Sequence, residues 1–117
     1  MITNESAMTQ ITQFTDLPGT TAHRFDGHQR GASVSVFISH NPPGNGTDLH
    51  RHPYDETFIV QDGEATFTIA DETIVVRGGE IVVVPAGVPH KFINSGNQPL
   101  QKISIHPVPT MQTEWLN

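Results

Sequence analysis

The sequence predicts an all-β protein that folds as one small antiparallel barrel or sandwich. Its apolar residues come in short runs rich in Val, Ile, Thr and Phe, which suit a pleated and half-buried surface. Ten glycines and nine prolines punctuate these runs, and no run shows the period of an amphipathic helix. Short strands with frequent turns are typical of β-sandwiches and barrels. A chain of 117 residues is expected to form one domain with its own core.

Six apolar runs are the strongest strand candidates. We expect strands over residues 32–39, 64–69, 73–77, 80–84, 90–93 and 101–106. Turns between them are indicated by Asp62-Gly63, Gly78-Gly79, Pro85-Ala86-Gly87 and Asn94-Ser95-Gly96-Asn97.

Alternation along a strand predicts which side chains face the interior. On the strand 32–39, the alternate apolar residues are followed on the same face by His40, which we therefore expect to point inward. The run 80–84 is apolar after its first residue and is expected to be covered on both faces.

The two ends of the chain lie outside the predicted barrel strands. Residues 1–20 are polar and are expected to form an arm that pairs with an edge strand of a neighbouring subunit. Residues 110–117 form a tail in which Trp115 and Leu116 are apolar enough to dock on the barrel or on a partner subunit.

Composition excludes several classes of function. The absence of cysteine excludes disulfides, thiolate zinc sites, iron–sulfur clusters and a cysteine nucleophile. A net charge of −6 without a Lys/Arg cluster argues against binding to nucleic acid or to an anionic membrane. No apolar run has membrane-spanning length, and residues 1–8 do not resemble a secretory signal. We therefore expect a cytoplasmic protein.

Three histidines and one glutamate have the spacing of a single metal site. His50 and His52 lie two apart, so on a strand they point to the same side. Glu56 opens the next strand after a short turn, and His90 begins the strand 90–93. Imidazole nitrogens and carboxylate oxygens are ligands for divalent Fe, Mn, Ni, Co, Cu and Zn, so the pattern predicts a divalent ion without choosing among them.

The glycines and prolines around these four residues complete two motifs that resemble those of the cupin family. The first motif is read as Gly44, His50, His52, Glu56 and Gly63, and the second as Gly79, Pro85, Gly87, His90 and Asn94. Every spacing of both motifs is met.

The resemblance implies a cupin jelly-roll β-barrel, an antiparallel double sheet, over residues 21–109. It implies that His50, His52, Glu56 and His90 bind one divalent metal ion inside the barrel. Small cupins usually pair, so a homodimer is expected. The motif glycines are expected to occupy turns that need positive φ.

The family hosts several activities, and two hypotheses from different classes follow. The first is a metal-dependent enzyme, with Glu56 as a candidate base. Its substrate would be a small neutral molecule of aromatic or enolic type, because Arg51 and Lys91 alternate with the ligands and should face away. A dioxygenase-type reaction is favoured, and an isomerase or cyclase is next. Residues expected to line the pocket or to support the ligands are His40, Phe58, Val60, Phe92 and His106.

The second hypothesis is a binding or sensing module in which the metal holds a small ligand without turnover. Cupin sensors usually carry an attached DNA-binding domain, and this sequence shows no helix-turn-helix pattern. That weakens the second hypothesis relative to the first.

Overall fold

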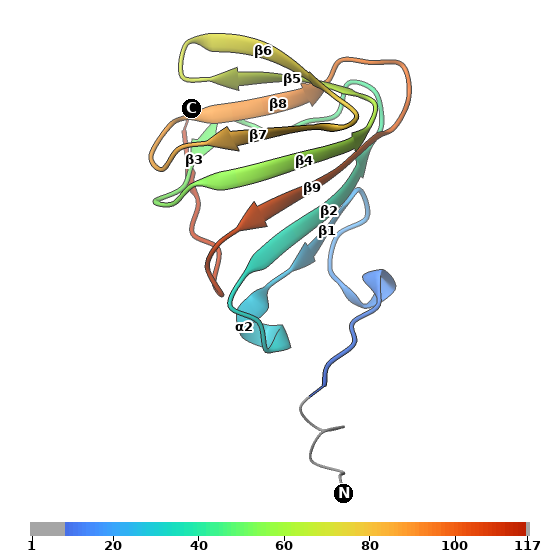
Figure 1. Cartoon of the computed structure of the whole chain (residues 1–117), viewed down its shortest axis with the longest axis vertical. Coiled ribbons are helices and arrows are strands. Elements are labelled where there is room, and N and C mark those ends of the chain that lie inside the picture. Colours follow the sequence, from blue (N-terminus) through green and yellow to red (C-terminus); the bar gives the residue numbers. More distant parts are fainter. Residues whose placement is uncertain (1–8, 117) are drawn as a thin grey trace, which may run out of the picture.

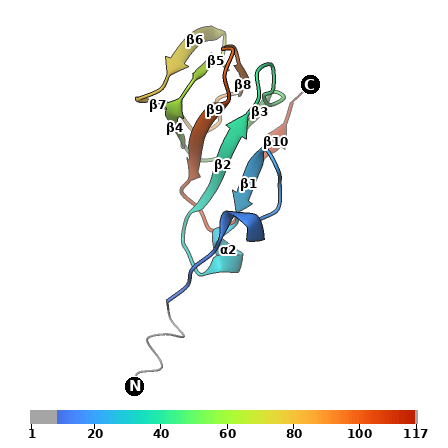
Figure 2. The same cartoon turned by 90° about the vertical axis from the view of Figure 1, so that its right-hand side faces the viewer.

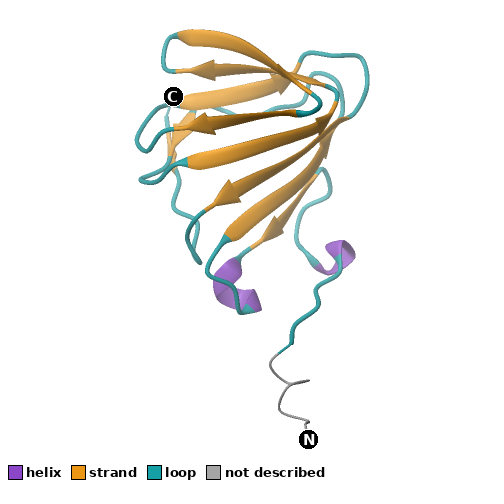
Figure 3. Cartoon of the chain, viewed as in Figure 1, coloured by secondary structure: helices purple, strands orange, loops and turns teal. Residues whose placement is uncertain are grey.

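A computed structural model describes residues 9–116 and shows two five-stranded antiparallel sheets that face each other as a barrel (Figures 1 and 3). The strands in chain order are β1 (Ala22–Phe25), β2 (Ser35–Asn41), β3 (His50–Arg51), β4 (Glu56–Asp62), β5 (Glu64–Ile69), β6 (Glu72–Arg77), β7 (Glu80–Val84), β8 (His90–Asn94), β9 (Leu100–His106) and β10 (Glu114–Trp115). One sheet has the order β1-β2-β9-β4-β7, and the other has the order β10-β3-β8-β5-β6. The predicted fold class is confirmed.

The observed strands follow the predicted ones closely. The predictions 64–69 and 80–84 coincide with β5 and β7, and the other four overlap β2, β6, β8 and β9. The short strand β1 gives no sequence signal, because His23 and Arg24 interrupt any apolar alternation in it. The only helical pieces of the described chain are one turn at Phe14–Asp16 and α2 (Gly27–Arg30), near one end of the barrel. No helix within residues 9–116 is long and apolar enough to cross a membrane.

The apolar core fills one half of the barrel. Its buried members are Phe58, Val60, Ala65, Phe67, Val76, Val84, Phe92 and Leu100. The Phe67 ring packs against those of Phe58 and Phe92, with centroids 4.9 and 5.7 Å apart. Seven of these residues belong to β4 to β8, and Leu100 is contributed by the start of β9. The other buried side chains of β2 and β9 are polar.

Two strands turn polar side chains inward, which reverses one expectation. The buried polar side chains of β2 and β9 are Ser35, Ser39, Asn41, Lys102, Ser104 and His106. The alternate residues of the same strands, such as Ile38 and Ile103, lie half-buried on the outer surface. The expectation that His40 points inward is therefore wrong. His40 shares the outer face of Ile38 and is exposed.

The outer surface of the β1-β2-β9-β4-β7 sheet is apolar along its middle. Strand register places Ile38 opposite Ile103, Ile103 opposite Ile59, and Ile59 opposite Ile81. We call these four residues the isoleucine row. The expectation that residues 80–84 are covered on both faces is wrong, because 64% of Ile81 and 52% of Val83 are exposed.

The segment just before β1 and the C-terminal tail both contact the barrel of their own chain. Leu17 is buried, and the Pro18 carbonyl accepts a hydrogen bond from the Arg24 amide at 2.9 Å. Residues 1–8 of the expected N-terminal arm lie outside the described residues, so pairing with a neighbouring subunit stays a prediction. At the other end, β10 pairs with β3 (Figure 2), so the tail docks on the barrel of its own chain.

Candidate functional site

The four residues predicted to form a metal site lie together inside the barrel. His50 opens β3, Glu56 opens β4 and His90 opens β8, while His52 follows β3 directly. All four are buried, and one donor atom from each lies within 4.8 Å of the others. His50 and His90 are partners in the register of β3 and β8. We call His50, His52, Glu56 and His90 the His/Glu cluster.

Two tight turns hold the cluster strands in place. The Gly87 amide donates to the His52 carbonyl at 2.7 Å, and the Ala86 amide donates to the Asp55 carboxylate at 2.9 Å. Gly87 has a φ of +79°, a left-handed conformation that strains any residue with a Cβ atom. The turn before β8 is thereby fixed against the segment between β3 and β4.

All three cluster histidines present the same nitrogen to the centre. The Nδ1 atoms of His50, His52 and His90 lie 2.7, 2.7 and 2.9 Å from the carbonyls of Asp48, Gln112 and Val88. A carbonyl can only accept a hydrogen bond, so each Nδ1 carries the proton. Each Nε2 of a neutral ring then offers a lone pair, which is the form of histidine that binds a metal.

Glu56 lies where these lone pairs meet. Its Oε1 atom is 3.0 Å from Nε2 of both His52 and His90. Burial alone would raise the pKa of Glu56, but contacts with His106, His52 and His90 outweigh burial and hold that pKa well below its usual range. The carboxylate is therefore ionised at neutral pH.

The cluster has the chemistry of a cation site. The buried Nε2 atom of His52 has no properly aligned hydrogen-bond partner, although Glu56 Oε1 is close. A lone pair facing a carboxylate oxygen at 3.0 Å is repulsive unless a proton or a metal ion lies between them. Burial lowers the pKa of His50, which keeps that ring in its neutral, ligating form. The residues present fit a divalent ion.

His106 and Tyr54 support Glu56 from its other side. His106 Nε2 lies 3.0 Å from Glu56 Oε2, and the Tyr54 hydroxyl lies 2.7 Å from His106 Nδ1. The Gln112 amide donates to the same hydroxyl at 3.2 Å. The sequence singles out His106 but not Tyr54, although Tyr54 continues the two-residue spacing of His50 and His52.

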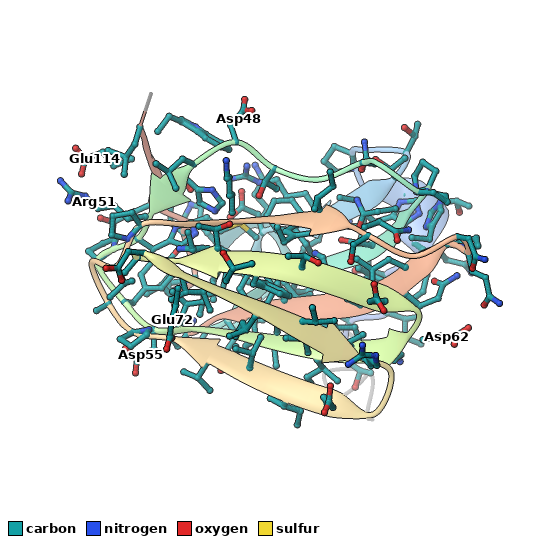
Figure 4. The ribbon with its side chains drawn as sticks, turned by 90° about the horizontal axis from the view of Figure 1, so that it is seen from above. Asp48, Arg51, Asp55, Asp62, Glu72 and Glu114 are labelled. Atoms are coloured by element: carbon teal, nitrogen blue, oxygen red, sulfur yellow. The ribbon has the colours of Figure 1, made fainter. Side chains whose placement is uncertain are left out.

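The C-terminal tail completes the wall of the site. The Gln112 carbonyl accepts the proton of His52 Nδ1, and the Trp115 ring lies 5.0 Å from that of His50. On the outside, the Arg51 and Glu114 side chains meet at 2.7 Å and point away from the barrel (Figure 4). The expectation that Arg51 faces away from the ligands is confirmed.

A cavity of about 250 Å³ opens beside the cluster. Its lining includes His50, His52 and Glu56 of the cluster, together with Phe58, Phe92, Ser39, Ser104, Lys102, His106 and Trp115. Phe58, Phe92 and His106 thus lie where they are predicted. Val60 is a buried core residue and His40 is exposed, and neither is among the residues that line this cavity.

The cavity also contains a cation that the sequence prediction misses. Lys102 is only 3% exposed and reaches into the space between Phe58 and Phe92. The expectation of a neutral substrate assumed a pocket poor in lysine and arginine because Arg51 and Lys91 face away. Lys102 and Arg24 both line the cavity, so that assumption is wrong. The signal is present in β9, where Lys102, Ser104 and His106 share one face.

Comparisons with known proteins agree with this architecture. A family model described as "Cupin domain" matches residues 37–106. A protein of Streptomyces coelicolor described as uncharacterised is 49% identical over 63 residues, which is 54% of this chain and 60% of that protein. A gentisate 1,2-dioxygenase from a Ralstonia species is 24% identical over 88 residues, covering 74% of this chain and 25% of the enzyme. The chain spans less than two thirds of the length of the curated relatives it matches.

A solved structure from Klebsiella pneumoniae has the same fold. It is described as an uncharacterised conserved protein with a double-stranded beta-helix domain, and it matches with a TM-score of 0.69 at 20% identity. The match covers 93% of this chain and 98% of that one, so the two proteins share the whole barrel.

Proposed function

The chain belongs to the cupin family, and on that premise we propose that it is a metal-dependent enzyme of dioxygenase type acting on a small aromatic or enolic molecule. The observation that carries the proposal is the convergence of three imidazole Nε2 atoms and one carboxylate within 4.8 Å, beside a cavity. The similarity to a gentisate dioxygenase supports the reaction type.

His50, His52, Glu56 and His90 would hold one divalent ion, which is the donor set expected for Fe, Mn, Ni, Co, Cu or Zn. Such an ion supplies Lewis acidity and, if it is redox-active, electron transfer. The three backbone carbonyls that receive the Nδ1 protons orient the rings toward it.

Glu56 is the candidate base for a substrate hydroxyl. Because the contacts of Glu56 hold its pKa low, it would keep an accepted proton only briefly. His106 Nε2 lies 3.0 Å from Glu56 Oε2 and would hold that oxygen in place, while Tyr54 fixes the His106 ring through Nδ1. Phe58 and Phe92 provide the apolar wall against which an aromatic or enolic substrate would lie.

The proposal is tested by oxygen consumption. Protein loaded separately with Fe(II), Mn(II), Ni(II) and Cu(II) is mixed with a panel of phenols and β-diketones, and products are identified by mass spectrometry. We expect oxygen uptake with at least one pair of metal and substrate, and loss of that uptake in Glu56→Gln.

Two other results would redirect the assignment. An isomeric product formed without oxygen uptake would replace the dioxygenase with an isomerase or cyclase. A ligand that binds stoichiometrically and is recovered unchanged would contradict an enzyme and leave a binding or sensing module.

A further inference from the structure

The cavity holds a buried cation whose charge no residue of the described chain balances by direct contact. We propose that Lys102 is the anion-binding residue of this cavity, and that the ligand is a small organic acid whose carboxylate or enolate pairs with Nζ while another oxygen faces the His/Glu cluster. The proposed pairing of the ligand's carboxylate or enolate with Lys102 does not depend on the proposed function. Only the placement of the second oxygen at the His/Glu cluster rests on it.

The burial of Lys102 carries the inference. Its side chain is almost completely enclosed, and within residues 9–116 no carboxylate oxygen lies within 4.0 Å of Nζ. The nearest polar partner is the Ser39 hydroxyl at 3.5 Å, the outer limit of a hydrogen bond. A buried ammonium group is unfavourable unless it is paired, so this position calls for an anion.

Nζ of Lys102 lies over two aromatic rings that line the same cavity. Nζ lies 4.1 Å from the Phe92 ring centroid and 5.4 Å from that of Phe58. These cation–π contacts partly offset the loss of water without satisfying the donor protons of the ammonium group. Burial lowers the pKa of Lys102 to about 8, so the side chain is still mainly charged at neutral pH.

The arrangement of the strands sets the size of the ligand. Phe92 follows the cluster residue His90 by two positions on β8, and Phe58 follows Glu56 by two positions on β4. Two residues of a strand correspond to about 7 Å. Nζ of Lys102 lies over these two rings. A ligand that reaches both Nζ and the cluster is therefore expected to be about as long as a hydroxybenzoate or a short oxo acid.

Arg24 is the other cation of the cavity wall, but it is neither buried nor without a carboxylate partner. Its side chain is 43% exposed and already faces the Asp26 carboxylate at 3.5 Å. Its charge is therefore screened by water and by a partner. Lys102 is the cation that needs a ligand.

The test compares two ligands that differ in one charge. Protein loaded with redox-inert Zn(II) is titrated by calorimetry with 3-hydroxybenzoate and with the uncharged 3-hydroxybenzamide, alongside formate, acetate and glycolate. We expect the benzoate to bind roughly tenfold more tightly than the benzamide, as for a charge-assisted contact. Lys102→Met should remove this preference by weakening only the carboxylates.

The matched control is Lys91→Met, because Lys91 is an exposed lysine beside the cluster residue His90. It should change neither affinity, and thermal melting checks that both variants fold. Equal affinities for the two benzoyl ligands in the unaltered protein, a retained preference in Lys102→Met, or no carboxylate bound at millimolar concentration would each overturn the inference.

Repeating the titration without metal separates this inference from the proposed function. A preference for carboxylates that depends on Lys102 in the metal-free protein would support the anion site even if the His/Glu cluster bound no metal. If metal-free Lys102→Met loses that preference, the anion site is supported. If the protein also fails to bind metal, only the proposed enzyme is contradicted.

Discussion

At the scale of single residues, the position of the Glu56 carboxylate depends on polar contacts with residues outside the His/Glu cluster. Tyr54 fixes the His106 ring, and His106 Nε2 lies against Glu56 Oε2. Replacing a group that orients a metal ligand in this way commonly lowers metal affinity by about ten- to a hundredfold. We therefore expect His106 to act as a positioning residue.

Replacing His106 tests this role. We expect His106→Leu to weaken metal binding about tenfold, because Glu56 loses the group that holds its second oxygen. Competition with a chromophoric chelator measures the affinity. His28→Leu, which changes an exposed histidine on α2, should have no effect. An unchanged affinity in His106→Leu would show that Glu56 is positioned without it.

Lys102 gives a second prediction at this scale, which concerns stability. Its pKa is about 8 in the folded protein, against 10.5 for an ordinary lysine, so folding disfavours its charged form. That penalty is full below pH 8 and is relieved between pH 8 and 10.5, where the folded state releases the proton first. The free energy of unfolding attributable to Lys102 therefore rises with pH across this window.

Lys102→Met should accordingly stabilise the ligand-free protein at pH 7, by a few kcal/mol at most. The difference between the two proteins should shrink as the pH rises above 8. Arg24, Glu56, His50, His52 and His106 border the same cavity in both proteins, so the difference between them isolates Lys102. Urea unfolding from pH 6.5 to 10 measures it. If Lys102→Met were less stable than the unaltered protein at pH 7, the conclusion that the buried charge of Lys102 destabilises the ligand-free protein would be contradicted.

At the scale of elements, the C-terminal tail acts as part of the site. β10 pairs with β3, and the Leu116 amide donates to the Leu49 carbonyl at 2.9 Å. Just before β10, Gln112 provides the acceptor for His52 Nδ1. The tail thus fixes the orientation of one ligand and covers another with Trp115.

Removal of residues 110–117 should weaken metal binding by roughly tenfold, because His52 loses the carbonyl that sets its tautomer. Arg51→Ala is the matched control, since it removes only an exposed ion pair between β3 and the tail. Chelator competition on both proteins gives the comparison. If the truncated and full-length chains bind metal equally, the tail does not orient His52.

At the scale of the whole molecule, the isoleucine row predicts the homodimer. Ile81, Ile59, Ile103 and Ile38 form a continuous apolar strip on the outside of one sheet, with Val83 beside it. Exposed apolar strips of this kind are typical of interfaces, and a two-fold axis would pair the strip with itself.

Light scattering after size-exclusion chromatography tests the predicted dimer. The unaltered protein should elute as a dimer and Ile81→Glu as a monomer. Val75→Glu changes an exposed valine of β6 on the other sheet and should leave the dimer intact. A monomeric unaltered protein, or an unchanged dimer in Ile81→Glu, would place the interface elsewhere or remove it.

Much of the fold and of the site can be predicted from the sequence, because local rules determine those parts. Strands β5 and β7 follow from their apolar runs, and Gly63 and Gly87 adopt the positive φ expected of motif turns. The His/Glu cluster follows from fixed spacings on strands. These features depend on residues that are close in sequence, or on motif residues whose spacing along the chain is fixed.

The remainder depends on which face of each strand turns inward. The usual rule assigns apolar residues to the interior, but a barrel with a ligand cavity turns polar residues inward on the strands that line it. For this reason the alternation of β2 wrongly predicts that His40 points inward, and the same rule gives no reason to expect Lys102 of β9 inside. The tail contact with His52 is a long-range pairing that no local pattern encodes.

The central claim is that the His/Glu cluster binds one divalent ion, and metal content tests it most directly. Protein prepared without added metal is analysed by inductively coupled plasma mass spectrometry and then titrated with Mn(II), Fe(II) and Zn(II). We expect about one tightly bound ion per chain, retained in His40→Ala and lost when His50→Ala and His52→Ala are combined. Equal metal content in the double variant and the unaltered protein, or no binding of any ion by the latter, would contradict the account.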